Sequence, residues 1–398
     1  MQHFGLLLRL IYKRISLFTQ HKQNRGRVFR DERLCFLFFH YKKLLHLHRI
    51  SKLHFMNTLQ RLYILLLTFS MCYGCRPDAE GIWQTERNNV TDVTDRIQIV
   101  SAAQYDVAMT GTLVPYVIGP YVMIADHNMI NGAIHVFRKG DMRYLTSFGK
   151  PGGYSGEIAA LGHVAWDDVH KEIMVADLGH LMVYGFPLDS ILQHPDAAPI
   201  VRSKLQKSSY PQHFFQIANG QWFSLQMIRD TPTRHKQVTG IFQMKEGTFS
   251  MQDYTHPDID EKRVSLDVDA ERGIYVEANH RYDHLTISSL DGSSHLNIYG
   301  PQWQTEGLMH FDDVAIGSNH IYALYNGHPR KKREAEQKEG KDYAQDIIVF
   351  SLEGHYIETL HLDRGITHLC CDKENDQLIL TFADTERKAN QLIGILKC

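Results

Sequence analysis

The apolar positions of the chain recur as short runs of about six residues, separated by turns rich in Asp, Asn and Gly. Six such runs end at steps of 47 to 57 residues, and helical periodicity is nearly absent. Apolar runs of this length, rich in β-branched and aromatic residues and bounded by turn residues, predict strands buried on both faces. The six runs are Tyr121–Asp126, Glu172–Asp177, Gln221–Gln226, Gly273–Ala278, His320–Tyr325 and Gln377–Phe382.

A second apolar run follows each of the six, as at Ala133–Phe137, and Gly-bearing turns such as Leu290–Ser293 lead to a further strand. Six β units with a period near 50 residues predict an all-β fold, the six-bladed β-propeller. Because the sequence stops just after the third strand of the last unit, we expect an N-terminal strand near Tyr105–Leu113 to join the last blade and close the ring. The alternative is a two-sheet β-sandwich or two stacked small β domains, but sandwich strands do not account for the regular period.

The apolar run from Leu62 to Phe69 is different in kind. It follows Met56 and Arg61, and it is too short to span a bilayer, which needs about 20 apolar residues. A basic start followed by a short apolar core is typical of a cleavable signal peptide, which we place at residues 56–74.

The signal peptide ends in Gly74-Cys75, followed by polar residues. This ending resembles the bacterial lipoprotein signal, in which the cysteine after the cut receives the lipid, although Cys72 and Tyr73 depart from the usual pattern. Cys75 is therefore the predicted lipid-attachment residue. Two alternatives remain: an ordinary signal peptide, or a Cys-x-x-Cys redox motif formed by Cys72 and Cys75.

Charge separates residues 1–55 from the rest of the chain. Twelve Lys or Arg stand there against two acids, whereas the whole chain has a net charge of −2. We interpret residues 1–55 as an over-called start or a disordered basic extension, with an organelle transit peptide as the alternative. The remainder is acidic, which argues against nucleic acid as a partner.

We expect a lipidated spacer at residues 75–100 and the propeller domain at residues 101–398, in a protein that is a monomer. Three cysteines follow Cys75, too few for a disulfide scaffold. Cys370 and Cys371 are adjacent, so they should point to opposite faces of a strand, and whichever faces inward should pack in the core.

A glycine-rich segment, Phe148–Ile158, carries a family resemblance. Phe148, Gly149, Gly152, Gly156 and Glu157 are similar to the Phe-Gly-x-x-Gly turn of TolB-like six-bladed propeller lipoproteins, whereas Tyr154, Ser155 and Ile158 depart from it. The resemblance covers about residues 100–398 and implies a propeller fold and a location in the bacterial cell envelope, as an outer-membrane lipoprotein. It implies no particular reaction. The segment lacks the Gly-Lys-Ser/Thr of a phosphate loop, so we interpret it as a turn between blades.

Polar residues near the strand ends are the candidate ligand-binding residues. Carboxylates and imidazoles that converge on a propeller axis could bind a ligand, hold a metal or transfer protons. The alternative is that Asp and Asn at strand ends bond only to their own turns. The candidates are Asp126, His127, Asp177, His180, Glu277 and His280.

These patterns favour a membrane-anchored, exported binding or scaffolding module for a protein, a peptide or a glycan. No cofactor is expected apart from the lipid on Cys75, and no catalytic residue is assigned. The alternative is a propeller-type hydrolase or lyase with a metal-lined axial pocket. That enzyme would need Asp126, Asp177 and Glu277 to reach one pocket.

Overall fold

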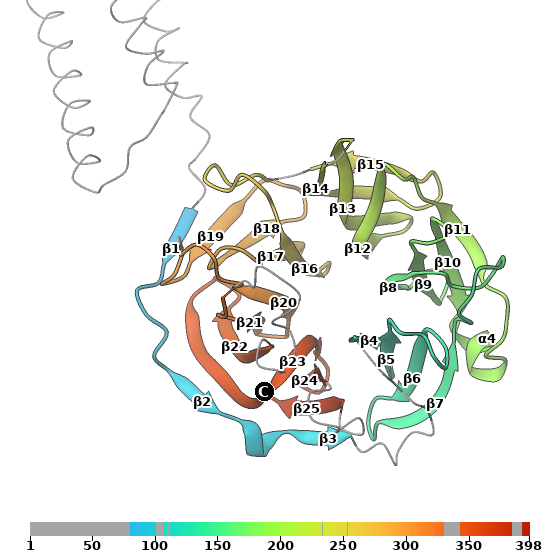
Figure 1. The fold of residues 1–398 in the computed structure, drawn as a ribbon, viewed down its shortest axis with the longest axis horizontal. Coiled ribbons are helices and arrows are strands. Elements are labelled where there is room, and N and C mark those ends of the chain that lie inside the picture. Colours follow the sequence, from blue (N-terminus) through green and yellow to red (C-terminus); the bar gives the residue numbers. More distant parts are fainter. Residues whose placement is uncertain are drawn as a thin grey trace, which may run out of the picture. The chain divides into compact units, whose positions relative to one another are not determined.

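The computed structural model describes residues 80–398 except 101–106, 108, 110–111, 233, 253, 304, 330–342 and 384–391. Residues 1–55, the expected signal peptide and Cys75 lie outside the described residues. Within them the chain is almost wholly β, and Figure 1 shows the sheets arranged in a ring around a common axis.

The first three blades are antiparallel sheets of four consecutive strands each. The one helix named in this part of the chain, α4 (Leu188–Gln193), lies between two strands of blade 2. Blade 1 contains β4 (Leu113–Ile118), β5 (Tyr121–Asp126), β6 (Ile134–Arg138) and β7 (Arg143–Phe148); blade 2 contains β8 (Leu161–Asp167), β9 (Glu172–Asp177), β10 (Met182–Pro187) and β11 (Ile200–Lys204); blade 3 contains β12 (Ser209–Ala218), β13 (Gln221–Thr231), β14 (Arg234–Gln243) and β15 (Thr248–Met251).

The last three blades share strands with the N-terminal part of the domain. Strand β23 serves two blades, because its first part pairs with β22 and its last residues pair with β24. Blade 4 contains β16 (Val264–Asp269), β17 (Ile274–Asn279), β18 (His284–Ser289) and β19 (His295–Tyr299); blade 5 contains β20 (Phe311–Ile316), β21 (His320–Tyr325), β22 (Ala344–Ser351) and the first part of β23 (Tyr356–Asp372); blade 6 contains the rest of β23, β24 (Gln377–Phe382), β25 (Ile393–Lys397) and β3 (Gln98–Val100). The predicted six-bladed propeller is confirmed.

Apolar clusters fill the spaces between neighbouring blades, and among the described residues there is one cluster at each of six interfaces. Strand β9 illustrates why the predicted strands are apolar at consecutive positions. Ile173 and Val175 pack with blade 1, whereas Met174 and Ala176 pack with blade 3. A strand that is buried on both faces has no polar side to present to water. The six apolar runs are therefore the second strands of the six blades.

A polar side chain also bonds to the neighbouring backbone at each of these interfaces. Asp267, for example, accepts the backbone N–H of Ile316 at 2.7 Å. Such bonds satisfy backbone groups that would otherwise be buried without a partner. The pairs, in order around the ring, are Tyr116 with Val164, His163 with Phe214, Gln237 with Val264, Asp267 with Ile316, Asp313 with Leu369, and Thr381 with Leu113.

Residues 80–100, here called the strap, differ from the expected spacer. Strand β1 (Glu80–Trp83) pairs in parallel with β19, and β2 (Val90–Asp92) pairs in parallel with β23. After the 3-10 turn η2 (Thr94–Arg96), β3 pairs antiparallel with β25. Figure 1 shows the strap on the outside of blades 4 to 6.

Closure of the ring by an N-terminal strand is confirmed, but the strand that closes it lies earlier than expected. It is Gln98–Val100. Leu113, expected at the end of the closing strand, instead begins β4, the first strand of blade 1. The structure describes only some of the residues from Tyr105 to Leu113, and among these only Leu113 lies in a strand.

One arginine fixes the strap to the propeller. Arg87 Nη2 lies 2.8 Å from Asp283 Oδ1, with the two side chains only 9% and 1% exposed. The guanidinium also lies over the rings of Phe311, Tyr325 and Phe350, at 5.6 to 5.9 Å. Such cation–π contacts gain strength when they are shielded from water. The side chain of Arg87 therefore enters the space between blades 4 and 5.

Candidate functional site

The carboxylates of Asp126 and Asp177 organise the turns that follow their strands. Asp126 Oδ1 accepts the backbone N–H of Asn128 at 2.8 Å, and Asp177 Oδ1 accepts that of Gly179 at 2.9 Å. Asn279, at the same place in blade 4, accepts the N–H of Arg281. Side chains of Asp and Asn commonly cap turns in this way, so the turn alternative describes the geometry of both aspartates.

Asp177 and His180 connect the turn of blade 2 to the glycine-rich segment. His180 Nδ1 lies 2.7 Å from Asp177 Oδ2, and its Nε2 lies 3.1 Å from the carbonyl oxygen of Gly153. Asp177 raises the pKa of His180 because the carboxylate favours the imidazolium. In the same segment, Gly149 has a φ of +78°, and a Cβ there would lie 3.1 Å from the Cβ of Ala133. The segment is therefore an inter-blade turn that requires glycine.

Asp177→Asn is expected to lower the free energy of unfolding by about 2 kcal/mol. The two carboxylate oxygens accept N–H groups of Ala159, Ala160, Gly179 and His180, whereas Asn offers one acceptor oxygen and turns an NH₂ group towards donors. Urea unfolding of the two proteins measures the loss.

The control for this change is Asp291→Asn, in an exposed hairpin where the carboxylate accepts the N–H of Ser293 at 2.9 Å. Asparagine serves such a turn equally well, so little change is expected. Equal losses in the two variants would contradict the assignment of Asp177 as the organiser of this turn.

Glu277 lies at a small separate cavity in blade 4. Its Oε1 pairs with Lys262 Nζ at 2.8 Å, and both side chains are almost fully buried. His284 and Thr286 also line the cavity, whose volume of about 20 Å³ suits a single water molecule. The contacts of Asp126, Asp177 and Glu277 therefore lie at separate places in blades 1, 2 and 4.

The axis presents a different set of polar side chains, one from each blade. Four of them sit on the first strands, which lie innermost in Figure 1, and two lie in the turns after second strands. We call this set the axial cluster. Its members, from blade 1 to blade 6, are His127, His163, His213, His280, Asp312 and His368.

Contacts connect several members of the axial cluster around the axis. The rings of His163 and His213 lie 4.9 Å apart. The hydroxyl of Ser265 lies 3.0 Å from His280 Nε2 and donates to the carbonyl oxygen of Asp312 at 2.8 Å. The cluster therefore joins blade 2 to blade 3 and blade 4 to blade 5.

Electrostatic interactions connect members of the cluster that belong to blades that are not neighbours. Burial lowers the pKa of His213 to about 4, and a proton on His280 or His368 would lower it further. His213 and His368 belong to blades 3 and 6, on opposite sides of the ring. His127 is exposed, yet its pKa is lowered because surrounding protein displaces water and because His368 is near.

The histidines of the cluster are neutral at pH 7. Burial lowers the pKa values of His280 and His368 to about 4, and that of His163 well below its usual range. A neutral imidazole offers one donor and one acceptor. His127 is exposed and His213, His280 and His368 are partly exposed, so the cluster has hydrogen-bonding groups that a ligand can reach.

A second level of polar groups lies deeper along the first strands. Burial raises the pKa of Asp267 to about 6 and that of Asp313 to about 7. Burial also raises the pKa of the Cys370 thiol, and Cys371 and Asp313 add to the effect. Cys370 and Cys371 pack against different apolar clusters, so they do point to opposite faces of β23.

Acid should destabilise the protein through the axial histidines. Their folded pKa near 4 lies below the unfolded value near 6.5, so between these values the unfolded state binds more protons and stability falls as pH falls. Asp312, Asp267 and Asp313 have raised pKa values and act in the opposite sense. Removing two histidines should therefore shift the balance towards stability in acid.

The expected result is that His213→Gln/His368→Gln gains about 2 kcal/mol relative to the wild type between pH 7 and pH 5, after allowance for solvent screening. Urea unfolding at the two pH values measures this difference. His355→Gln, at an exposed position, is the control. A stability difference from the wild type that is the same at both pH values would show that the axial imidazoles are not desolvated.

Of the candidates named from sequence, His127 and His280 belong to the axial cluster, whereas Asp126, Asp177, His180 and Glu277 do not. His163, His213, Asp312 and His368 were missed. The sequence does contain a signal for them, because each is a polar residue within the strand that precedes an apolar second strand. It was obscured because first strands mix polar and apolar residues.

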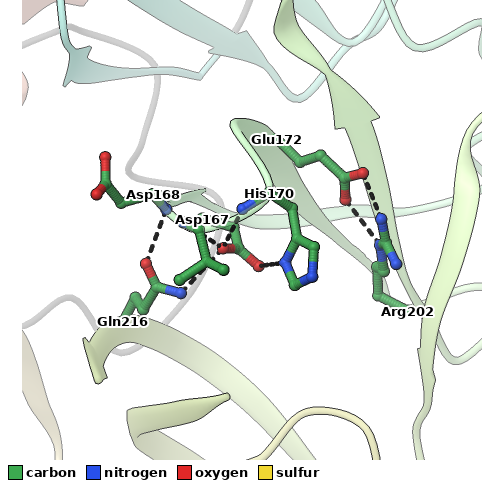
Figure 2. Close-up of polar contacts among 7 residues, drawn as sticks. Asp167, Asp168, His170, Glu172, Arg202 and Gln216 are labelled. Atoms are coloured by element: carbon green, nitrogen blue, oxygen red, sulfur yellow. Dashed lines mark hydrogen bonds and ion pairs between the residues drawn. The ribbon is translucent and has the colours of Figure 1, made fainter. Parts of the chain in front are cut away.

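A separate polar network lies at the other end of β8. Figure 2 shows Gln216 of blade 3 donating to Asp167 Oδ1 at 2.9 Å while it accepts the backbone N–H of Asp168 at 2.8 Å. His170 Nδ1 lies 2.8 Å from Asp167 Oδ2, and Arg202 pairs with Glu172. Burial would raise the pKa of Asp167, but the bonds from His170 and Gln216 lower it overall. The network joins two blades and caps a turn.

Metal binding and membrane spanning can be stated only for the described part of the chain. No group of three or more His, Cys, Asp or Glu side chains there has an arrangement that could hold a metal ion. No helix there combines the length and apolar character needed to cross a membrane.

Comparison with known proteins supports the fold. Residues 276–374 match the model of the family described as TolB-like 6-blade propeller-like. No curated protein sequence matches the chain. A member of the DUF4221 family from Bacteroides vulgatus is similar in structure, with a TM-score of 0.51 and 10% identity, over 78% of this chain and 98% of that one.

Two further solved structures are similar at lower scores. One is a luciferin-regenerating enzyme, with a TM-score of 0.49 and 10% identity, over 76% of this chain and 95% of the other. The second is a protein from Bacteroides fragilis described as exported, with a TM-score of 0.48 and 9% identity, over 80% and 98%. The chain is thus a six-bladed β-propeller that is similar to TolB-like propellers over residues 276–374.

Proposed function

We propose that the protein is an exported lipoprotein of the bacterial cell envelope whose propeller binds a protein, a peptide or a glycan at the axial cluster. The observation that carries this proposal is the convergence of six polar side chains, one from each blade. Their neutral imidazoles can exchange hydrogen bonds with peptide groups or sugar hydroxyls without the desolvation cost of a charge. Binding there requires no covalent step.

The alternative enzyme loses its main support. It depended on Asp126, Asp177 and Glu277 reaching one pocket. Asp126 and Asp177 instead bond to the turns of their own blades, and Glu277 pairs with Lys262. These contacts account for carboxylates at strand ends without any catalytic role.

The sequence before the propeller supports the proposed location at a membrane. A basic start, a short apolar core and Gly74-Cys75 precede the strap, whose first strand begins at Glu80. A lipid on Cys75 would tether the domain, because several acyl chains bind a membrane stably where one chain does not.

Mass spectrometry of the protein isolated from its native membrane tests the proposed lipid anchor. A mature N-terminus at Cys75 carrying acyl chains is expected. An unmodified Cys75, or peptides from residues before Met56, would contradict it.

Copurification with a tagged, lipidated protein tests the ligand face. His213→Ala/His368→Ala should lose the copurifying partner, because the two imidazoles lie at the axis. His355→Ala is the control, since it removes an exposed imidazole from the hairpin between β22 and β23. The axial site would be overturned if His355→Ala lost as much partner as the double variant. It would also be overturned if the double variant still recovered the partner.

A further inference from the structure

The strap places a restriction on how a lipid-tethered propeller can face its membrane. Glu80 begins β1, and β1 is fixed to the edge of blade 4 by its parallel pairing with β19. Four residues lie between Cys75 and Glu80, so five steps of the chain join them. An extended chain gains at most about 3.6 Å per residue, so Glu80, at the outer edge of blade 4, can lie no more than about 18 Å from Cys75.

Exposed apolar side chains occur along the strap, the first of them three residues after Glu80. Trp83, in β1, is 54% exposed and stacks on Tyr299 with ring centroids 4.0 Å apart. Val90, in β2, is 58% exposed, and Ile357, which accepts a bond from Asn89 beside Val90, is 37% exposed. Trp and Tyr favour the level of the lipid headgroups, where one side of the ring is apolar and the other wet.

Charge favours apolar contact over electrostatic attraction at this edge. The exposed charges of the strap are Glu86, Asp92 and Asp95 against Arg96. Anionic lipids attract clusters of Lys and Arg, and the strap has no such cluster. A zwitterionic bilayer therefore suits this surface.

We propose that the outer edge of blades 4 and 5, formed by Trp83, Val90 and Ile357, rests on the lipid bilayer to which the protein is tethered. The inference rests on the lipid anchor of the proposed function. The propeller then stands edge-on, with its axis parallel to the membrane plane. Both ends of the axis, including the end that carries the axial cluster, stay accessible to a ligand.

Tryptophan quenching in vesicles tests this orientation. The lipidated protein is reconstituted into phosphatidylcholine vesicles with brominated or ordinary acyl chains, and tryptophan emission is compared. Emission of the wild type should fall in brominated vesicles, and this loss should vanish in Trp83→Phe, which keeps the ring stack on Tyr299. Trp83→Phe/Val169→Trp is the matched control, because Val169 is 50% exposed in blade 2.

The control tryptophan should show no quenching. Quenching that persists in Trp83→Phe, no quenching in the wild type, or equal quenching at residue 169 would overturn the orientation while leaving the anchor intact. Mass spectrometry of the same preparation separates the two claims. A membrane-bound protein without acyl chains on Cys75 would overturn the anchor, and the orientation with it.

Discussion

Asp283→Asn is expected to lower the free energy of unfolding by about 3–5 kcal/mol, because it leaves the buried Arg87 guanidinium without its counter-ion. The two side chains are 9% and 1% exposed and lie 2.8 Å apart. Asparagine has nearly the same shape, so the change removes charge with little change in packing. Urea unfolding measures the loss, and hydrogen exchange at Val90–Asp92 should accelerate as the strap loosens.

The matched control is Asp168→Asn, which breaks an ion pair with Lys171 whose side chains are 72% and 65% exposed. An exposed pair contributes about 1 kcal/mol or less. Similar losses in the two variants, or unchanged exchange in the strap, would show that Arg87 does not hold the strap to blades 4 and 5.

Val100→Asp should also cause a large loss, on the order of 3 kcal/mol or more, since it introduces a carboxyl group into an apolar environment. Val100 is 2% exposed and packs in the cluster between blades 6 and 1, beside Ile393 and Leu113. Its strand completes blade 6. Unfolding should become less cooperative as the ring opens, which chemical denaturation followed by fluorescence and circular dichroism can show.

Gln98→Asp places the same side chain two residues earlier in the same strand, at an exposed position. It should leave stability almost unchanged. If both substitutions had equal effects, residues 98–100 would not be the strand that closes the ring.

The second strands were predictable because both of their faces are buried between blades, which restricts their side chains to apolar types. Residues such as Ile173 and Met174 face different neighbouring blades, so consecutive positions inside the strand are apolar and the run is visible in the sequence. The first strands face the axis on one side, and polar residues such as His213 and Asp312 interrupt their pattern. Most of the axial cluster was therefore hidden in segments that resemble ordinary loops.

The strap was missed for a different reason. Its strands are three or four residues long and pair with partners far away in sequence, as Val90 does with Thr359. Local sequence carries little information about such pairing, because backbone groups supply the bonds. The one informative side chain, Arg87, has the appearance of an ordinary surface charge until its partner Asp283 is located in blade 4.

The most direct test of the proposed role is the hydrogen-exchange footprint of a partner captured with the wild-type protein. The partner is expected to slow exchange in peptides that contain His163, His213 and His368. Exchange around His170, at the other end of β8, should stay unchanged. Protection around His170, without protection at the three axial histidines, would contradict binding at the axial cluster.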